Sequence, residues 1–214
     1  MGSPNISRVQ LITNERSRLS ILEQVRAFCQ GGSDWVQLRL KEATEEEARE
    51  TALKAREITE RSNASLILDD RVGLVNEVGA DGVHLGERDM FPEKARTVLG
   101  KEALIGVTAD RFERVRELAW KTDYIGCGPF RNTDTKKALS PVLGVEGFRS
   151  ILRDMKAEGI TIPILAIGGI KKDDVPVLLN EGLFGIALSS AITEAEDPVR
   201  ETADIIEEVE QAAS

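Results

Sequence analysis

The stretch from Trp35 to Lys41, WVQLRLK, decides the fold because its apolar and polar side chains alternate from Val36 onward. The apolar positions are Val36, Leu38 and Leu40, and the polar positions are Gln37, Arg39 and Lys41. Side chains two residues apart on a β-strand lie on the same face. The pattern predicts a strand from Trp35 to Leu40 with one apolar face and one face that carries an amide and two cations.

The same succession of a short apolar run and a longer helical stretch continues on both sides of this strand. Strands are expected at Val9–Ile12, Trp35–Leu40, Ser65–Leu68, Gly82–Leu85, Leu104–Val107, Tyr124–Cys127, Ile162–Ile167 and Gly185–Leu188. Helices are expected at Leu19–Cys29, Glu45–Arg61, Val72–Val78, Phe91–Leu99, Phe112–Trp120, Val145–Glu158, Lys172–Asn180 and Pro198–Ala213. Start signals support two of them, because Thr44 with Glu47 matches a capping box, and Asp197 precedes a first-turn proline, Pro198.

Eight strand–helix units predict an α/β fold, a single closed (β/α)8 barrel of the TIM type over residues 1–214. A doubly wound open sheet is the alternative, but eight evenly spaced units favour closure. No shift in composition and no linker divides the chain into two domains. Met1-Gly2-Ser3 is typical of a remnant of cloning and adds nothing to the pattern.

The composition excludes several classes of protein. The 214 residues include 28 Lys and Arg against 37 Asp and Glu, a formal net charge of −9, whereas nucleic-acid-binding proteins present a basic face. No run approaches the roughly 18 apolar residues of a membrane span, so we expect no membrane partner and a cytoplasmic location. Cys29 and Cys127 have neither disulfide nor metal spacing, and we expect two buried thiols.

In a closed barrel the polar face of the Trp35–Leu40 strand must point inward, because helices cover the outer face. A solvated edge strand is the alternative, but a closed barrel has no edge. Polar and small residues follow the other strands too, and all should gather at the carboxyl ends of the strands, here called the mouth. They include Asp69, Asp70, Glu87, Arg88, Asp89, Thr108, Thr133, Thr135, Lys136, Gly168, Gly169, Ser189 and Ser190.

Two groups of these residues suggest phosphate binding. Gly168-Gly169 and Ser189-Ser190 match the usual phosphate site of such barrels, where backbone N–H groups hold the anion, although the glycines alone could form a tight turn. Arg39, Lys41 and Lys136 supply positive charge for a second, more highly charged phosphate group. Two anion sites at one mouth predict two phosphorylated substrates or one bisphosphate.

Asp70 and Asp89 suggest a metal site. Mg²⁺ is a hard cation that binds carboxylate oxygens and substrate phosphates together, so these side chains are its candidate ligands. Without a phosphate site nearby they would be interpreted as helix N-caps.

Two further features of the mouth remain open in function. Residues 128–144 lack apolar periodicity and exceed the ordinary connection of about 4 to 6 residues, so we expect an active-site loop that could close as a lid. His84, the only histidine, should lie on the inward face of its strand. A packed, hydrogen-bonded histidine explains it as well as a catalytic one does, and it receives no acid–base role.

Short motifs that run in order along nearly the whole chain add a family resemblance. They are QLRLK at 37–41, DDRV at 69–72, ADGVHLG at 80–86, DM at 89–90, YIG at 124–126, GP at 128–129, TDTK at 133–136, AIGGI at 166–170 and SAI at 190–192. Each is weak alone, and the ADGVHLG and AIGGI types recur in other phosphate-binding barrels. The ordered set is specific, and by it the chain resembles the thiamine phosphate synthase family.

The resemblance implies a cytosolic Mg²⁺-dependent barrel enzyme that joins 4-amino-5-hydroxymethyl-2-methylpyrimidine diphosphate to 4-methyl-5-(2-hydroxyethyl)thiazole phosphate. Pyrophosphate departure leaves a pyrimidine cation, which the thiazole nitrogen captures. By motif, the pyrimidine diphosphate contacts would be Gln37, Arg39, Lys41, Asp69 and Lys136, with Thr108 near the leaving group. The thiazole phosphate contacts would be Thr133, Thr135, Gly169, Ser189 and Ser190, and the metal ligands Asp70 and Asp89. Arg39, Lys41 and Lys136 would be catalytic through their charge.

The chain departs from the family pattern at two places, and two other functions compete. Asp69 stands where the family often has asparagine, and Arg131-Asn132 replaces a more usual tyrosine-proline. A thiazole tautomerase on the same barrel, which isomerises a thiazole carboxylate phosphate, lacks part of the cationic diphosphate site that is complete here. A non-catalytic phosphate-binding barrel is the other alternative, and Asp70 with Asp89 argues against it. No apolar stripe identifies a dimer face, so homo-oligomer formation stays open.

Overall fold

The computed structural model describes residues 6–132 and 141–213, in which eight parallel strands close into one barrel in chain order. The strands are β1 (Val9–Ile12), β2 (Trp35–Leu38), β3 (Ser65–Asp69), β4 (Gly82–Leu85), β5 (Leu104–Ala109), β6 (Tyr124–Cys127), β7 (Ile164–Ile167) and β8 (Gly185–Leu188). The barrel closes because β1 pairs with both β2 and β8. The predicted (β/α)8 fold is confirmed.

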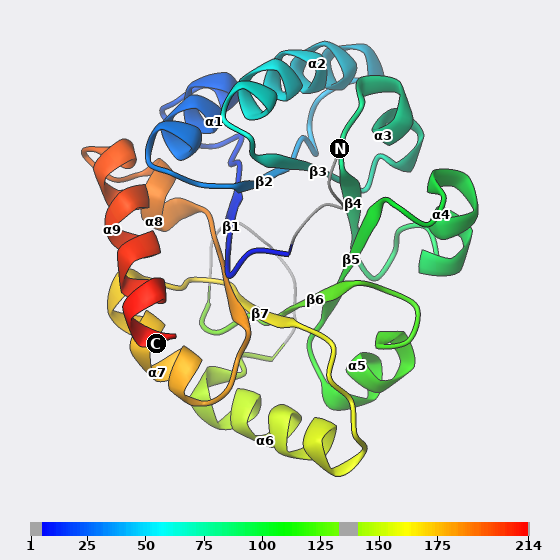
Figure 1. The fold of residues 1–214 in the computed structure, drawn as a ribbon, viewed down its shortest axis with the longest axis vertical. Coiled ribbons are helices and arrows are strands. Elements are labelled where there is room, and N and C mark those ends of the chain that lie inside the picture. The colour runs from blue at the N-terminus through cyan, green and yellow to red at the C-terminus, as the bar shows by residue number, and fades with distance from the viewer. Residues whose placement is uncertain (1–5, 133–140, 214) are drawn as a thin grey trace.

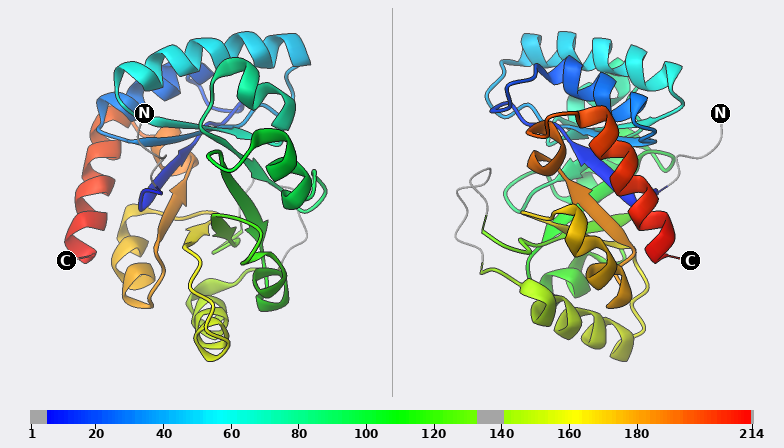
Figure 2. Two further views of the ribbon diagram at one scale, coloured as in Figure 1. Left: turned by 45° about the vertical axis from the view of Figure 1, so that its right-hand side comes forward. Right: turned by 90° about the vertical axis from the view of Figure 1, so that its left-hand side faces the viewer.

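Helices form a ring around the strands, as the view down the barrel in Figure 1 shows. They are α1 (Ile21–Gln30), α2 (Glu45–Arg61), α3 (Val72–Val78), α4 (Pro92–Leu99), α5 (Phe112–Leu118), α6 (Gly144–Ala157), the 3₁₀ turn η1 (Lys172–Asp174), α7 (Val175–Asn180), α8 (Ser190–Thr193) and α9 (Pro198–Ala212). The last helix, α9, packs against both α1 and α7 and completes the ring (Figure 2). No helix within the described residues is long and apolar enough to cross a membrane.

Because side chains alternate between the two faces of each strand, the apolar residues form two separate clusters. One cluster fills the space between the barrel and the helices, and includes Val36, Leu38 and the side chains of α2 such as Ala52. The other lies inside the barrel and consists of Ile12, Trp35, Ile67, Leu104, Tyr124, Leu165 and Ala187. Gln37 is buried, and its Nε2 donates a hydrogen bond to Asp69 on the neighbouring strand β3. The predicted inward polar face of β2 is therefore confirmed.

Glycines inside the barrel make room for its large rings. A Cβ on Gly106 would lie 2.0 Å from Cζ of Tyr124, and one on Gly126 would lie 3.2 Å from Cε1 of His84. The Tyr124 ring in turn meets the edge of the Trp35 ring, with centroids 4.8 Å apart. The rings of Tyr124 and His84 therefore occupy space that a side chain at Gly106 or Gly126 would fill.

Local chemistry explains where elements begin and end. The Thr44 capping box and the Asp197 N-cap are both confirmed. β7 begins at Ile164 rather than Ile162, because Pro163 has no N–H to give to the sheet. The predicted helix over residues 172–180 divides into η1 and α7, with Pro176 in the first turn of α7. The short helix α8 was not predicted.

Two aspartates hold the amino-terminal end of the barrel, opposite the mouth. Asp81 precedes β4, and its carboxylate accepts hydrogen bonds from Leu66 N–H and from Arg56, both at 2.8 Å. Asp123 precedes β6 and accepts in the same way from Ile105 N–H at 2.7 Å and from Arg96 at 2.6 Å. The N–H of each aspartate donates back to the carbonyl of the same neighbouring residue. Each pair of strands is thus fastened by a reciprocal backbone and side-chain contact.

An ion pair joins two loops at the mouth. The Arg131 guanidinium binds the Asp174 carboxylate through both of its terminal nitrogens, with Nη2 at 2.7 Å from Oδ1, and lies over the Phe130 ring. Burial alone would raise the pKa of Asp174, but hydrogen bonds from Arg131 and from Lys171 N–H outweigh it, so this pKa lies below its ordinary value. The loop after β6 is thereby fixed to the turn that starts η1.

We expect the Gly106→Ala variant to be less stable than the wild type by about 1–3 kcal/mol, because the new Cβ would force the Tyr124 ring out of its place. Urea unfolding measures the difference. Gly73→Ala is the matched control, since Gly73 lies in α3 with no atom within 4 Å of an added Cβ, and there alanine should add up to about 1 kcal/mol. Equal stability of Gly106→Ala and the wild type would contradict the packing described.

The Asp174→Asn variant should lose about 1 kcal/mol of stability at pH 7, because the amide cannot replace the ion pair with the partly exposed Arg131. A carboxyl whose folded pKa is lowered stabilises the fold above its unfolded pKa of about 3.9, and loses that contribution as the pH falls through the folded pKa. The difference from the wild type should therefore shrink below about pH 4 in urea unfolding. Asp173→Asn makes the same charge change at an exposed position and should show no such pH dependence. A constant difference at all pH values would rule out the ion pair as its source.

Candidate functional site

A cavity of about 620 Å³ opens at the mouth of the barrel. Every predicted site residue that the structure describes lines it, from six different strand ends: Gln37, Arg39, Lys41, Asp69, Asp70, Asp89, Thr108, Gly169, Ser189 and Ser190. Thr133, Thr135 and Lys136 lie outside the described residues. The closed barrel thus brings together side chains that are far apart in the sequence.

Asp69, on the inward face of β3, is the centre of a charged cluster. Its carboxylate accepts a hydrogen bond from Gln37 Nε2 at 2.7 Å and lies 2.8 Å from Lys41 Nζ and 3.9 Å from Arg39 Nε. The Asp69 side chain is only 8% exposed, so these cations offset a charge that burial would otherwise disfavour. The cations stay close to the cavity, because Arg39 and Lys41 both line it.

Asp70 is held in an unusual backbone conformation. Its φ is +63°, in the left-handed region, and its N–H donates to the His84 carbonyl at 2.9 Å. Aspartate tolerates this conformation better than most residues, and such strain is concentrated at functional sites. Lys41 bonds Asp70 Oδ2, whereas the buried Oδ1 has no hydrogen-bond partner among the residues that the structure describes. One carboxylate oxygen of a residue that lines the cavity therefore has unused lone pairs.

Asp89 lies in the turn after β4. One of its oxygens, Oδ2, accepts from Gly86 N–H at 2.6 Å, which fixes the carboxylate at the cavity wall. No three His, Cys, Asp or Glu side chains of residues 6–132 and 141–213 come close enough to form a metal site alone. Asp70 and Asp89 fit a different kind of site, in which one or two carboxylates share Mg²⁺ with water and substrate phosphates.

Residues after β1 position the two cations, and the sequence analysis missed them. Thr13 Oγ1 accepts from Arg39 N–H at 2.8 Å, and Glu15 accepts from Lys41 N–H at 2.7 Å. These side chains replace a neighbouring strand as hydrogen-bond partners, which is why β2 ends at Leu38 and not at Leu40 as predicted. The rule that polar residues after a strand belong to the mouth would have found Thr13, had it been applied to the first strand.

The turn after β7 offers backbone N–H groups. Gly168 and Gly169 have φ values of +97° and +70°, conformations that favour glycine. Arg131 binds both of their carbonyls, through its own N–H at 3.1 Å and through Nη1 at 2.6 Å. In the part of the chain that the structure describes, the N–H groups of the two glycines have no partner. This assigns Arg131 a structural task that the sequence had left open.

The serines after β8 complete this side of the cavity. Ser189 Oγ is buried and has no hydrogen-bond partner within the described ranges, and α8 begins at Ser190. The hydroxyl, together with the glycine N–H groups, forms a set of unpaired donors suited to an anion.

Two other side chains near the mouth are Arg114, a cation, and Cys127, a thiol. Arg114 on α5 lines the cavity and is 15% exposed, a cation that the helical pattern of α5 gave no reason to place there. Cys127 faces outward from β6, and burial raises the pKa of its thiol to about 12, so it is no nucleophile at neutral pH. Its predicted burial is confirmed, whereas Cys29 is only partly buried; both are free thiols.

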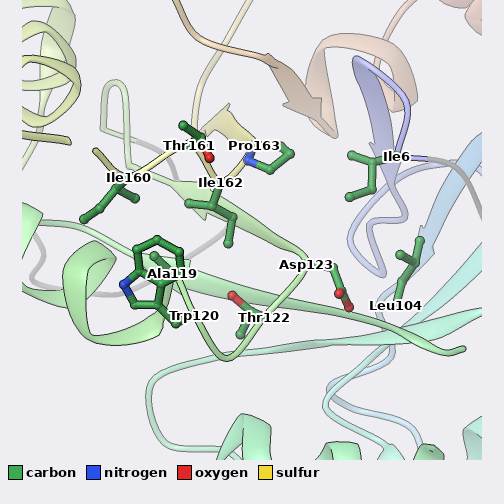
Figure 3. A pocket seen from close by; sticks show the side chains of 10 residues that line it. All are labelled: Ile6, Leu104, Ala119, Trp120, Thr122, Asp123, Ile160, Thr161, Ile162 and Pro163. Carbon is green, nitrogen blue, oxygen red and sulfur yellow. The ribbon is translucent and has the colours of Figure 1, made fainter. Parts of the chain in front are cut away.

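A second cavity, of about 520 Å³, lies at the opposite end of the barrel (Figure 3). It is lined by residues at or before the amino-terminal ends of strands, such as Ile6, Leu104 and Pro163, and by the exposed Trp120. Its one carboxylate, Asp123, is already engaged by Arg96 and by a backbone N–H. Asp123 is the only charged side chain among the described residues that line this cavity, so it has no set of charges comparable to that at the mouth.

Comparison with known proteins identifies the family of the chain. The family described as thiamine monophosphate synthase matches residues 9–192. The thiamine-phosphate synthase of Bacteroides fragilis is 49% identical over 92% of this chain and 98% of its own, and that of Phocaeicola vulgatus is 46% identical over 92% and 96%. The solved thiamine phosphate pyrophosphorylase of Pyrococcus furiosus is 35% identical with a TM-score of 0.85, covering 97% of each chain. The chain belongs to the thiamine monophosphate synthase family.

Proposed function

We propose that the chain is a thiamine phosphate synthase, a transferase of thiamine biosynthesis. It joins the pyrimidine diphosphate to the thiazole phosphate and releases pyrophosphate. The observation that supports this best is that two different groups of residues suited to anions line one cavity. One has the cations Arg39 and Lys41 beside carboxylates, and the other has the unpaired donors at Gly168-Gly169 and Ser189. Two phosphorylated substrates of unequal charge fit this division.

The roles proposed for the side chains combine this division with the family resemblance. On the first side, Gln37, Arg39, Lys41 and Asp69 would contact the pyrimidine diphosphate, with Thr108 near the leaving group. On the second side, Gly169, Ser189 and Ser190 would hold the thiazole phosphate. By the family resemblance, Thr133 and Thr135 would join the second set and Lys136 the first; all three lie outside the described residues.

Mg²⁺ is part of the proposal, with Asp70 and Asp89 as its protein ligands. The unpaired Oδ1 of Asp70 and the fixed carboxylate of Asp89 support this choice. When bound, the ion would add positive charge beside the diphosphate.

The catalytic contribution of the chain is electrostatic. Departure of pyrophosphate builds negative charge on the leaving group and positive charge on the pyrimidine, which the thiazole nitrogen then captures. Arg39, Lys41 and Lys136 would neutralise the leaving group as its charge grows. No protein nucleophile is required, which agrees with a cavity whose neighbouring cysteine is a buried, protonated thiol. A cytoplasmic location belongs to the same proposal, and both cysteines are free thiols.

The direct test supplies the purified protein with both substrates and Mg²⁺. We expect thiamine phosphate and pyrophosphate to form in equal amounts, measured by chromatography and a pyrophosphate assay. Isomerisation of a thiazole carboxylate phosphate without coupling would instead identify a tautomerase. Binding of the phosphates with neither reaction would identify a non-catalytic barrel.

The Asp89→Asn variant tests the metal ligand set without disturbing the turn, because an amide oxygen can still accept the Gly86 hydrogen bond. Loss of the charge should weaken Mg²⁺ binding in the presence of pyrophosphate on the order of tenfold by calorimetry. Glu87→Gln is the control, since Glu87 lines the same cavity but its side chain is 65% exposed and paired with Arg111. If both variants bind the ion as the wild type does, Asp89 is not a ligand.

A further inference from the structure

A chain of buried hydrogen bonds crosses the barrel interior and ends at the cavity. Gln10 Nε2 donates to the Tyr124 hydroxyl at 3.0 Å, this hydroxyl lies 3.2 Å from His84 Nδ1, and His84 Nε2 lies 3.0 Å from Thr108 Oγ1. The first three side chains are at most 4% exposed, whereas Thr108 is partly exposed and lines the cavity. The predicted inward position of His84 is thereby confirmed.

The available donors and acceptors give these hydrogen bonds one direction. The Gln10 amide nitrogen can only donate, so the Tyr124 oxygen accepts and its single proton needs another acceptor. His84 Nδ1 is the acceptor in reach, which puts the imidazole proton on Nε2, where it donates to Thr108 Oγ1. Burial raises the pKa of Tyr124, so its phenol keeps the proton that this arrangement requires.

The packing holds the participants in place. His84, Thr108 and Tyr124 come from the adjacent strands β4, β5 and β6, and Gln10 reaches them from β1 across the barrel. Gly106 and Gly126 leave the space that the two rings occupy, and Trp35 meets the Tyr124 ring from the side. The barrel core thus holds the side chains of these hydrogen bonds in place.

We propose that His84 is a positioning residue that makes Thr108 a hydrogen-bond donor toward the cavity. Because Thr108 Oγ1 already accepts from the imidazole, its own proton is directed to an acceptor on the substrate. Resting on the proposed function, the acceptor is an oxygen of the diphosphate leaving group, where negative charge grows. A bond to a ring nitrogen of the pyrimidine would instead oppose the cation. No proton is transferred in this role.

The first test observes the imidazole directly by NMR and needs no enzyme activity. Since His84 is the only histidine in the sequence, the imidazole signals belong to it alone. In ¹⁵N-histidine-labelled wild-type protein we expect the Nε2–H tautomer, with Nδ1 at the shift of a hydrogen-bonded acceptor. In Tyr124→Phe, Nδ1 should move toward the shift of an unbonded ring nitrogen while Nε2 stays protonated. An Nδ1–H tautomer in the wild type, or an Nδ1 shift that ignores the loss of the Tyr124 hydroxyl, would overturn the proposal.

The second test is a double-mutant cycle on turnover. Tyr124→Phe should lower kcat about three- to tenfold, the value of one hydrogen bond, and leave the KM of both substrates nearly unchanged. In a Thr108→Val background the same change should have no further effect, because the hydroxyl through which it acts is gone. Thr108→Ser keeps the hydroxyl and should retain most of the activity. Thermal unfolding of each variant separates this loss from a loss of folded protein.

The outcomes separate the two proposals. Additive effects of Tyr124→Phe and Thr108→Val, or full activity of Thr108→Val, would refute the role of His84 while the synthase activity stands. If the wild type makes no thiamine phosphate, the proposed function fails, but the tautomer measurement still decides the direction of the hydrogen-bond chain.

Discussion

The closure of the eight-stranded sheet is the constraint on which the rest of the structure depends. A closed barrel has no edge, so every inward side chain must fit a narrow core or emerge at one of its two ends. The rings of Trp35 and Tyr124 fill that core opposite glycines such as Gly106. Polar inward residues accumulate toward the mouth, and the same geometry that packs the core therefore assembles the candidate site.

The net charge of the whole chain does not describe the charges at the site. The net charge of −9 reflects carboxylates on exposed helix surfaces, such as the first turn of α2. At the mouth, Lys41 and Arg39 lie beside Asp69, so the local field depends on which of these groups a ligand engages. An acidic protein can in this way hold anionic substrates, because the field in the cavity governs binding more than the total does.

Much of the fold could be predicted from the sequence, and so could the position of many candidate site residues, because strand alternation and the residues that follow a strand are local features. The alternation of β2 placed Gln37, Arg39 and Lys41 at the mouth, and all three line the cavity. Contacts between loops that are distant in the sequence could not be predicted. The pairing of Arg131 with Asp174 depends on the spacing of the loops after β6 and β7, which no periodicity encodes. The direction of the hydrogen bonds around His84 likewise requires Gln10, from the far side of the barrel.

The aspartates at the amino-terminal end have a consequence for how the chain can change in length. Asp81 and Asp123 each reach a backbone N–H on the preceding strand and donate their own N–H in return. Inserting or deleting one residue just before β4 or β6 would separate these partners and leave a buried N–H unpaired. The loops at the mouth are under no such requirement where they only border the cavity. Variation in loop length among related chains is therefore expected at the mouth, where it can alter substrate preference, and not at the opposite end.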